Sequence, residues 1–149
     1  MPTRTGWGSG GWSYGGILTD YTIATDPLRF KAAISGASSA LQAVDMASIS
    51  TSCSTKPRLG PPWKSQDLWL KVSYPFFHAD RIKTPTLYAG RRAKTSTCRS
   101  SAPEQMYQAL KSSGVDTQLV VYPGQHHGLS IPSYQRDRLE RWVGWFDKY

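Results

Sequence analysis

Gly11-Trp12-Ser13-Tyr14-Gly15 is the most informative segment of this chain. It matches G-x-S-x-G, the pattern of a sharp turn between a strand and a helix that raises a serine hydroxyl above a sheet. We expect the flanking glycines to be required because side chains beside the serine would clash with neighbouring elements. The turn also aims the first N–H of the helix at an oxyanion. The pattern predicts Ser13 as nucleophile, Tyr14 N–H as oxyanion donor, and Gly11, Gly15 and Gly16 as the glycines of the turn.

Helix and strand patterns alternate after this turn, whereas the residues before it carry little strand pattern. Periodicity and stop signals predict helices within 17–24, 65–72, 103–113 and 133–149, and strands at 30–36, 86–90 and 117–122. In the first helix the apolar residues Ile17, Leu18, Tyr21 and Ile23 to Ala24 approximate a helical stripe. Residues 37–60 show no sustained period. The alternation predicts an α/β fold with a parallel sheet covered by helices.

The composition is that of one globular domain spanning residues 1–149. Hydrophobic residues make up 39% of the chain, enough for a packed core. No stretch reaches the ~18 apolar residues of a membrane span, and the first ten residues lack the apolar core of a signal peptide. We therefore expect a cytoplasmic location and no membrane partner. Cys53 and Cys98 are assigned no role, because two distant cysteines suggest neither a metal site nor a disulfide framework.

The chain carries a formal charge of +8, which raises the question of an anionic partner. The positive residues do not form one helical stripe, and several gather in 56–58 and 91–99. No recognised nucleic-acid-binding motif accompanies the charge. A basic nucleic-acid-binding domain is the rival interpretation, but we expect no nucleic-acid partner.

The general base is expected late in the chain, on a loop that follows a strand. Residues 122–128 form such a loop and contain two histidines, His126 and His127. A nucleophile that precedes its histidine in the chain is the order of α/β-hydrolases. We favour His127 and keep His126 as the alternative. The third histidine, His78, lies in a Phe-rich stretch and is expected to be a packed or capping residue.

Four blocks of sequence resemble one family. They are GWSYGG at 11–16, LGPPWKSQDLWLKVSYPFFHADRIKTPTLY at 59–88, EQMYQALKSSGVDTQLVVYPGQHHG at 104–128 and PSYQRDRLERWVGWFDKY at 132–149. Together they resemble the catalytic domain of prolyl oligopeptidase-family serine peptidases, in particular its acylaminoacyl-peptidase and dipeptidyl-peptidase-like members. The resemblance implies an α/β-hydrolase fold, peptide substrates, Ser13 as nucleophile and His127 as base, with no metal or cofactor.

The same resemblance implies an incomplete domain, the C-terminal half of a mostly parallel sheet flanked by helices. The earlier strands, the upstream oxyanion donor and the family's β-propeller have no counterpart in these 149 residues. A half sheet leaves an edge uncovered, so self-association through that edge is expected.

The chain departs from the family where the acid of the catalytic triad belongs. The family has an acidic segment such as KDFNVP after the strand at 86–90, and its Asp corresponds to Thr95 here. We hypothesise a local reading-frame error, since one set of codons that encodes residues 94–98, AAG-ACT-TCA-ACG-TGC, contains GAC-TTC-AAC-GTG when read one base earlier, and this encodes Asp-Phe-Asn-Val. Sequencing the gene tests this. Asp80 and Asp116 precede strands, and neither is expected to substitute.

Two functions follow from these observations. The first is a serine peptidase that forms an acyl-enzyme on Ser13 with His127 as general base. The alternative is a catalytically impaired fragment or pseudoenzyme of the same family. Losing one oxyanion donor would lower the rate by about 10² to 10³, and losing the orienting Asp by about 10⁴.

Overall fold

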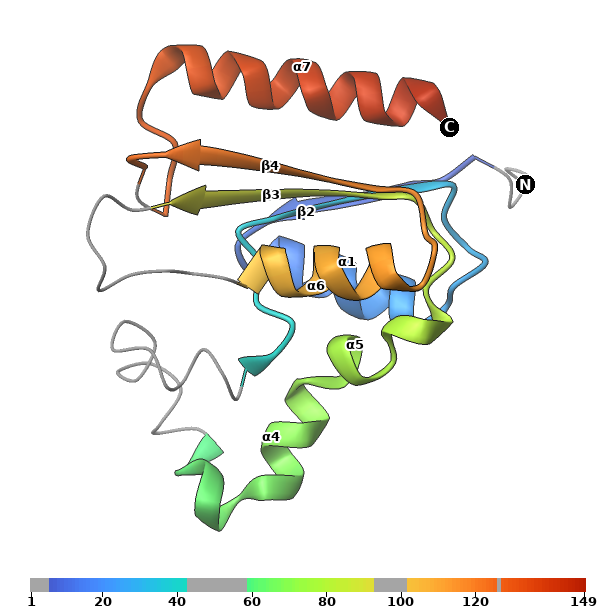
Figure 1. Ribbon diagram of the computed structural model, residues 1–149, viewed down its shortest axis with the longest axis vertical. Coiled ribbons are helices and arrows are strands. Elements are labelled where there is room, and N and C mark those ends of the chain that lie inside the picture. Colours follow the sequence, from blue (N-terminus) through green and yellow to red (C-terminus); the bar gives the residue numbers. More distant parts are fainter. Residues whose placement is uncertain (1–5, 43–58, 93–101, 126) are drawn as a thin grey trace.

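In the computed structural model the chain forms a four-stranded parallel sheet with the strand order β1-β2-β3-β4 (Figure 1). The structure describes residues 6–42, 59–92, 102–125 and 127–149. The strands are β1 (Gly8–Trp12), β2 (Ala32–Gly36), β3 (Thr86–Arg92) and β4 (Thr117–Pro123). The α/β fold class and its parallel sheet are thus confirmed, and the little-patterned segment before Ser13 is a strand.

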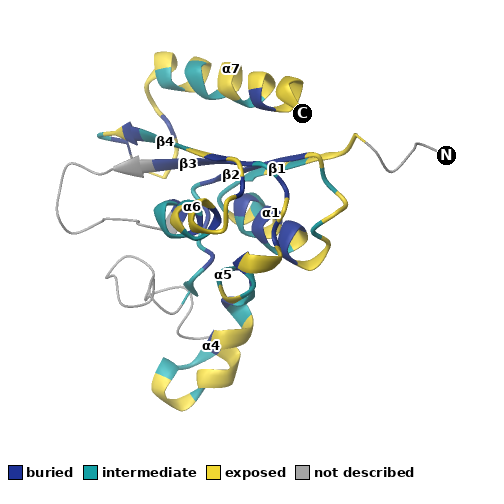
Figure 2. Cartoon of the chain, turned by 45° about the vertical axis from the view of Figure 1, so that its right-hand side comes forward, coloured by how far each residue is buried: buried dark blue, intermediate teal, exposed yellow. Residues whose placement is uncertain are grey.

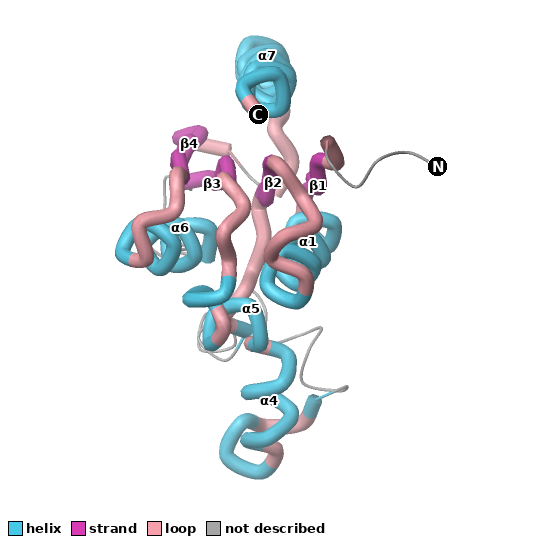
Figure 3. The backbone as a smooth tube through the Cα atoms, turned by 90° about the vertical axis from the view of Figure 1, so that its right-hand side faces the viewer, coloured by secondary structure: helices cyan, strands magenta, loops and turns pink. Residues whose placement is uncertain are grey.

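Three connections cross over one face of the sheet. Helix α1 (Tyr14–Thr25) joins β1 to β2, and α6 (Ala102–Ser112) joins β3 to β4. Between β2 and β3 lie η1 (Pro62–Lys64), α4 (Gln66–Val72), α5 (Tyr74–Phe77) and η2 (Ala79–Arg81). Figure 3 shows α1, α5 and α6 together below the sheet. Right-handed crossovers between strands that follow one another in a parallel sheet all return over the same face, which explains this layer.

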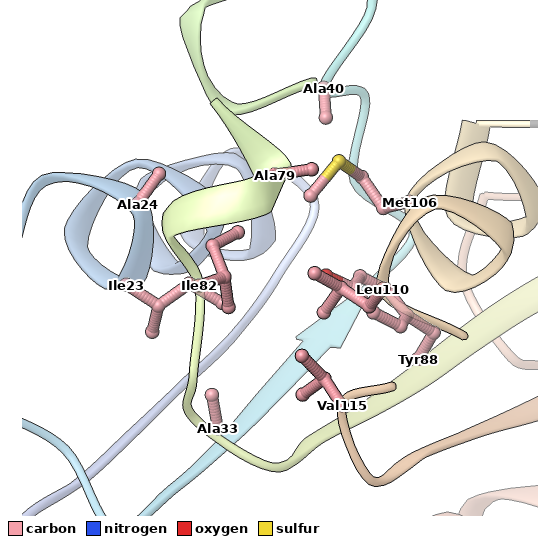
Figure 4. Close-up of a cluster of buried hydrophobic side chains, with 10 residues drawn as sticks. All are labelled: Ile23, Ala24, Ala33, Ala40, Ala79, Ile82, Tyr88, Met106, Leu110 and Val115. Carbon is pink, nitrogen blue, oxygen red and sulfur yellow. The ribbon is translucent and has the colours of Figure 1, made fainter. Parts of the chain in front are cut away.

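The layer under the sheet contains the larger core. Tyr88 and Ala33 from the sheet meet Ile23 of α1, Met106 of α6 and Ile82 after η2 (Figure 4). All five residues are fully buried. Leu110, Val115, Ala24, Ala40 and Ala79 complete the cluster. Elements far apart in sequence are therefore joined by one apolar cluster directly behind the serine turn.

The other face of the sheet is covered by the last helix, α7 (Pro132–Lys148), which lies above the sheet in Figure 1. Only Trp145 of this helix is buried, and it packs on Ala32, Ile34 and Leu87. Leu139 and Val143 remain exposed, at 56% and 61%. Figure 2 shows most of α7 in the exposed colour. One helix thus covers this face only in part.

The predicted apolar stripe of α1 is correct for Ile23 and Ala24 and wrong for Leu18. The buried residues of this helix are Gly16, Thr19, Asp20, Ile23 and Ala24, whereas Leu18 is 49% exposed. A Cβ added to Gly16 would lie 2.6 Å from the carbonyl oxygen of Gly36 in β2. Because the helix approaches the sheet so closely there, the face with the small residue turns inward and the bulky Leu18 turns outward.

The strand registers bring the carboxyl ends of β1 and β2 together, with Trp12 opposite Gly36. Strand β4 runs beside β3 from Thr117 to Pro123, so its carboxyl end lies at the same edge. In open parallel sheets this is the edge at which ligands bind. No helix within the described ranges is long and apolar enough to cross a membrane.

Candidate active site

Ser13 lies between β1 and α1 in a backbone conformation that few residues adopt. Its φ is 61° and its ψ is −120°. A non-glycine residue at positive φ is strained and persists only where its surroundings hold it. Here the Ser13 N–H donates to the carbonyl oxygen of Gly36 at 2.8 Å, which ties the turn to β2. The sequence pattern thus produces the strained strand-to-helix turn that it predicted.

The glycines of the turn are not equivalent. A Cβ on Gly11 would lie 2.4 to 2.7 Å from backbone atoms of Gly15, so a side chain there has no room. A Cβ on Gly15 would meet nothing within 4 Å. The expectation of a clash on both sides of the serine is therefore correct for Gly11 and wrong for Gly15. The second tight position is Gly16, which packs on Gly36 as described above.

The N-terminus of α1 opens directly beside Ser13. The first hydrogen bond of the helix is donated by Ile17 N–H to the Ser13 carbonyl oxygen, at 3.1 Å. The N–H groups of Tyr14, Gly15 and Gly16 therefore precede the helical bonding pattern, and such groups favour negative charge. The side chain of Tyr14 is 69% exposed. Tyr14 N–H is thus a backbone donor next to Ser13 that precedes the hydrogen bonds of the helix.

His127 and Ser13 come from opposite ends of the chain and meet at this edge of the sheet. The Nε2 atom of His127 lies 2.6 Å from Oγ of Ser13, across 114 residues of sequence. This separation is within the range over which a general base takes a proton. The alternative histidine, His126, lies outside the described residues.

The loop that carries His127 is held by side-chain amides. The carboxamide oxygen of Gln125 accepts hydrogen bonds from Ser130 N–H at 2.8 Å and from the Ser130 hydroxyl at 3.2 Å. The side chain of Gln135 donates to the Leu129 carbonyl oxygen at 2.6 Å. Gln125 is only 3% exposed. Nothing in the sequence marks this residue as part of the site, because a glutamine in a polar loop shows no pattern that distinguishes a buried one.

No carboxylate within the described residues is hydrogen-bonded to His127. The position that corresponds to the triad Asp, Thr95, lies outside them. Asp116 lies before β4, at the far end of that strand from the His127 loop, and bonds to Lys148 and Tyr149. Those partners lower the pKa of its carboxyl group. Asp80 lies in η2, before β3. Neither is placed to orient the histidine.

One carboxyl group is fully buried in α1, beneath the serine turn. Asp20 accepts a hydrogen bond from the Tyr88 hydroxyl at 3.3 Å on Oδ1, while Oδ2 is buried without a partner. Burial raises the pKa of Asp20 to about 7, although the hydroxyls of Ser38, Ser35 and Tyr88 offset part of the rise. A carboxyl group with this pKa is protonated in acidic solution and loses its proton around neutral pH.

The other candidate groups lie away from this edge. His78 stacks on Tyr74 at 3.9 Å between ring centroids, and its Nδ1 lies 2.9 Å from the Tyr74 carbonyl oxygen, as expected for a packed histidine. In the part of the chain that the structure describes, no three His, Cys, Asp or Glu side chains are grouped to hold a metal ion. Cys53 and Cys98 lie outside that part.

Comparison with known proteins gives consistent matches. Residues 4–149 match the model of the prolyl oligopeptidase family. The chain is 29% identical over 147 residues to the uncharacterized peptidase YuxL of Bacillus subtilis, covering 93% of this chain and 22% of that protein. It is 27% identical over 160 residues to the acylamino-acid-releasing enzyme of Arabidopsis thaliana, covering 93% of this chain and 19% of that protein.

A solved structure agrees with this match. The uncomplexed acylaminoacyl peptidase of Pyrococcus horikoshii is 26% identical in sequence and superposes with a TM-score of 0.84. The match covers 97% of this chain and 24% of that one. The chain therefore spans about a fifth to a quarter of the length of the proteins that it resembles.

Proposed function

Because the chain belongs to the prolyl oligopeptidase family, we propose that it hydrolyses peptide bonds of oligopeptides through an acyl-enzyme on Ser13. The single observation that carries the proposal is the 2.6 Å contact between Ser13 Oγ and His127 Nε2. A serine hydroxyl is a poor nucleophile unless an adjacent base accepts its proton. In this proposal the strained turn supplies the nucleophile Ser13, and the loop after β4 supplies the base His127.

The proposed reaction has two halves. Ser13 Oγ attacks the carbonyl carbon while His127 Nε2 takes the hydroxyl proton, and the N–H of Tyr14 donates to the oxyanion. Collapse of the tetrahedral intermediate breaks the bond to the leaving amine, which receives the proton from His127. A water molecule loses a proton to His127 and attacks the acyl-serine. His127 returns this proton to Ser13 Oγ as the ester bond breaks and the acid is released.

Fluorophosphonate labelling of the purified chain tests this proposal. The probe forms a covalent bond with a serine hydroxyl only when a base activates it, so the parent chain should label. Ser13→Ala should abolish labelling and His127→Gln should slow it by about 10³ or more, because the base is removed. Both variants should unfold at the same urea concentration as the parent.

The outcomes separate cleanly. Equal labelling of parent and Ser13→Ala means reaction elsewhere in the chain, and equal labelling of parent and His127→Gln removes His127 from the mechanism. Once labelling succeeds, turnover of short peptides with free and with acylated N-termini defines the substrate class.

A second candidate is a catalytically impaired member of the family. The observation that favours it is that no described carboxylate contacts His127. A triad without its orienting acid keeps its geometry but reacts about 10⁴-fold more slowly. A folded parent chain that does not label would support this candidate and reject the first.

A further inference from the structure

The side chain of Trp12 links the nucleophile strand to the base. Its indole Nε1–H donates to the backbone carbonyl oxygen of His127 at 3.0 Å. The neighbouring residue, Ser13, meets the imidazole of the same histidine at 2.6 Å. Two consecutive residues at the end of β1 therefore hold His127 at two points, its backbone and its ring.

The path of the indole depends on the glycine beside it. Trp12 lies opposite Gly36 in the register of β1 and β2. A Cβ on Gly36 would lie only 2.3 Å from Cε3 of Trp12, so the ring lies directly against the glycine backbone. Since Gly36 carries no side chain, the indole extends across β2 toward the end of the sheet where the His127 loop returns.

Packing then holds the ring in place. Trp12 is half-buried against a cluster formed by Ala89 of β3, Tyr122 of β4 and Leu129 of the loop. The guanidinium carbon of Arg138 in α7 lies 5.1 Å from the centroid of the same ring. An indole fixed on several sides presents its N–H in one direction, so the hydrogen bond costs little side-chain entropy.

We propose that Trp12 is a positioning residue that sets the distance between Ser13 Oγ and the His127 imidazole. This inference rests on the proposed function, because a positioned base matters only if it takes the serine proton. A general base that is misplaced by a fraction of an ångström to an ångström loses much of its effect. The backbone anchor is especially relevant where no described carboxylate steadies the ring.

Trp12→Phe tests the proposal, because it removes the indole N–H and keeps an aromatic ring. The matched control is Trp142→Phe, since the Trp142 Nε1 is buried without a hydrogen-bond partner and Arg138 lies 5.6 Å from its ring. Fluorophosphonate labelling is followed at several probe concentrations, and each rate is corrected for the folded fraction. This separates the maximum labelling rate from the concentration that gives half of it.

We expect Trp12→Phe to lower the maximum rate about tenfold and to leave the half-maximal concentration unchanged. Labelling should still run to completion. Trp142→Phe should stay within about twofold of the parent. An unchanged maximum rate in Trp12→Phe, or an equal loss in Trp142→Phe, would overturn the inference. The inference would also be overturned if the loss of labelling rate disappears once the rate is corrected for the folded fraction, because Trp12 would then act on stability alone.

A measurement that does not depend on the reactivity of Ser13 distinguishes failure of this inference from failure of the proposed function. In the ¹⁵N spectrum of the parent, the Trp12 indole proton should exchange with water much more slowly than that of Trp63, which is 77% exposed. Trp12→Phe identifies its signal. If the parent does not label, the proposed function fails, and slow indole exchange still supports the anchor on His127. Exchange as fast as that of Trp63 overturns the anchor whether or not the chain labels.

Discussion

The Ser13 turn and the His127 loop meet at two hydrogen bonds, made by Ser13 and Trp12, but are held in different ways. The turn is fixed by backbone contacts, Gly11 against Gly15 and Gly16 against Gly36. The loop is fixed by side-chain hydrogen bonds, chiefly from the carboxamide of Gln125. A backbone contact admits no added atom, whereas a side-chain brace is weakened only when its polar atoms are removed. The turn should therefore be sensitive to added side-chain atoms, and the loop to the removal of polar side-chain atoms.

Gly11→Ala should break the turn and have the largest effect. The added methyl group meets backbone rather than a movable side chain, so the free energy of unfolding should fall by more than about 3 kcal/mol, above the usual cost of overpacking. Fluorophosphonate labelling should be lost with it. Urea unfolding and labelling of the same sample measure both. A variant with the parent's stability would show that the turn opens easily, against the rigidity proposed for it.

Asp20→Asn tests the interior beneath the turn. The buried carboxyl has a pKa of about 7, against about 4 in the unfolded chain. Between these values the folded chain keeps a proton that the unfolded chain has released, so stability falls as the pH rises through this window. Between pH 5 and pH 7 the parent should lose about 2 kcal/mol, and the loss should be complete about one pH unit above the folded-state pKa.

The asparagine variant cannot lose a proton and should lack this part of the pH dependence. Urea unfolding of both proteins at pH 5 and pH 7.5 measures the difference, in which other titrating groups cancel. Parallel curves for the two proteins would mean that Asp20 is already ionised in the fold at pH 5.

Gln125→Ala tests the loop. Removing the carboxamide leaves the N–H groups of Ser130 and Ile131 without their acceptor, so the unfolding free energy should fall by about 2 kcal/mol. Amide exchange in residues 127–131 should become faster, while exchange in α1 stays unchanged. Gln108→Ala is the control, since Gln108 is exposed on α6 and bonds only within its own helix. Equal effects of the two substitutions would remove Gln125 as the brace of the loop.

Gly15→Ala should have the smallest effect and sharpens the contrast within the turn. A Cβ there meets nothing, and Gly15 lies in the first turn of α1 at a φ open to other residues. Alanine should therefore raise the unfolding free energy by about 0.5 to 1 kcal/mol, because it restricts the unfolded chain. The measurement is again urea unfolding. A loss of stability comparable with that of Gly11→Ala would contradict the difference between the two glycines.

Much of the fold was predictable because its signals are local. The strands at 86–90 and 117–122 and the helix at 103–113 are confirmed within two residues at each end. β1 was harder, because Gly8, Gly10 and Gly11 give a strand no side chains to show a period. The buried face of α1 was predicted only in part, since Asp20 and Thr19 face the core because Gly16 lets the helix approach β2.

Sequence patterns predict the alternation of strands and helices, the strained turn at Ser13 and the candidate His127, because each depends on residue types close together in the chain. The folded structure was needed to find that Trp12 donates to the backbone of His127, that Gln125 is buried, and that burial raises the pKa of Asp20. These three properties depend on groups brought together from distant segments, and a one-dimensional pattern does not encode the distances between them.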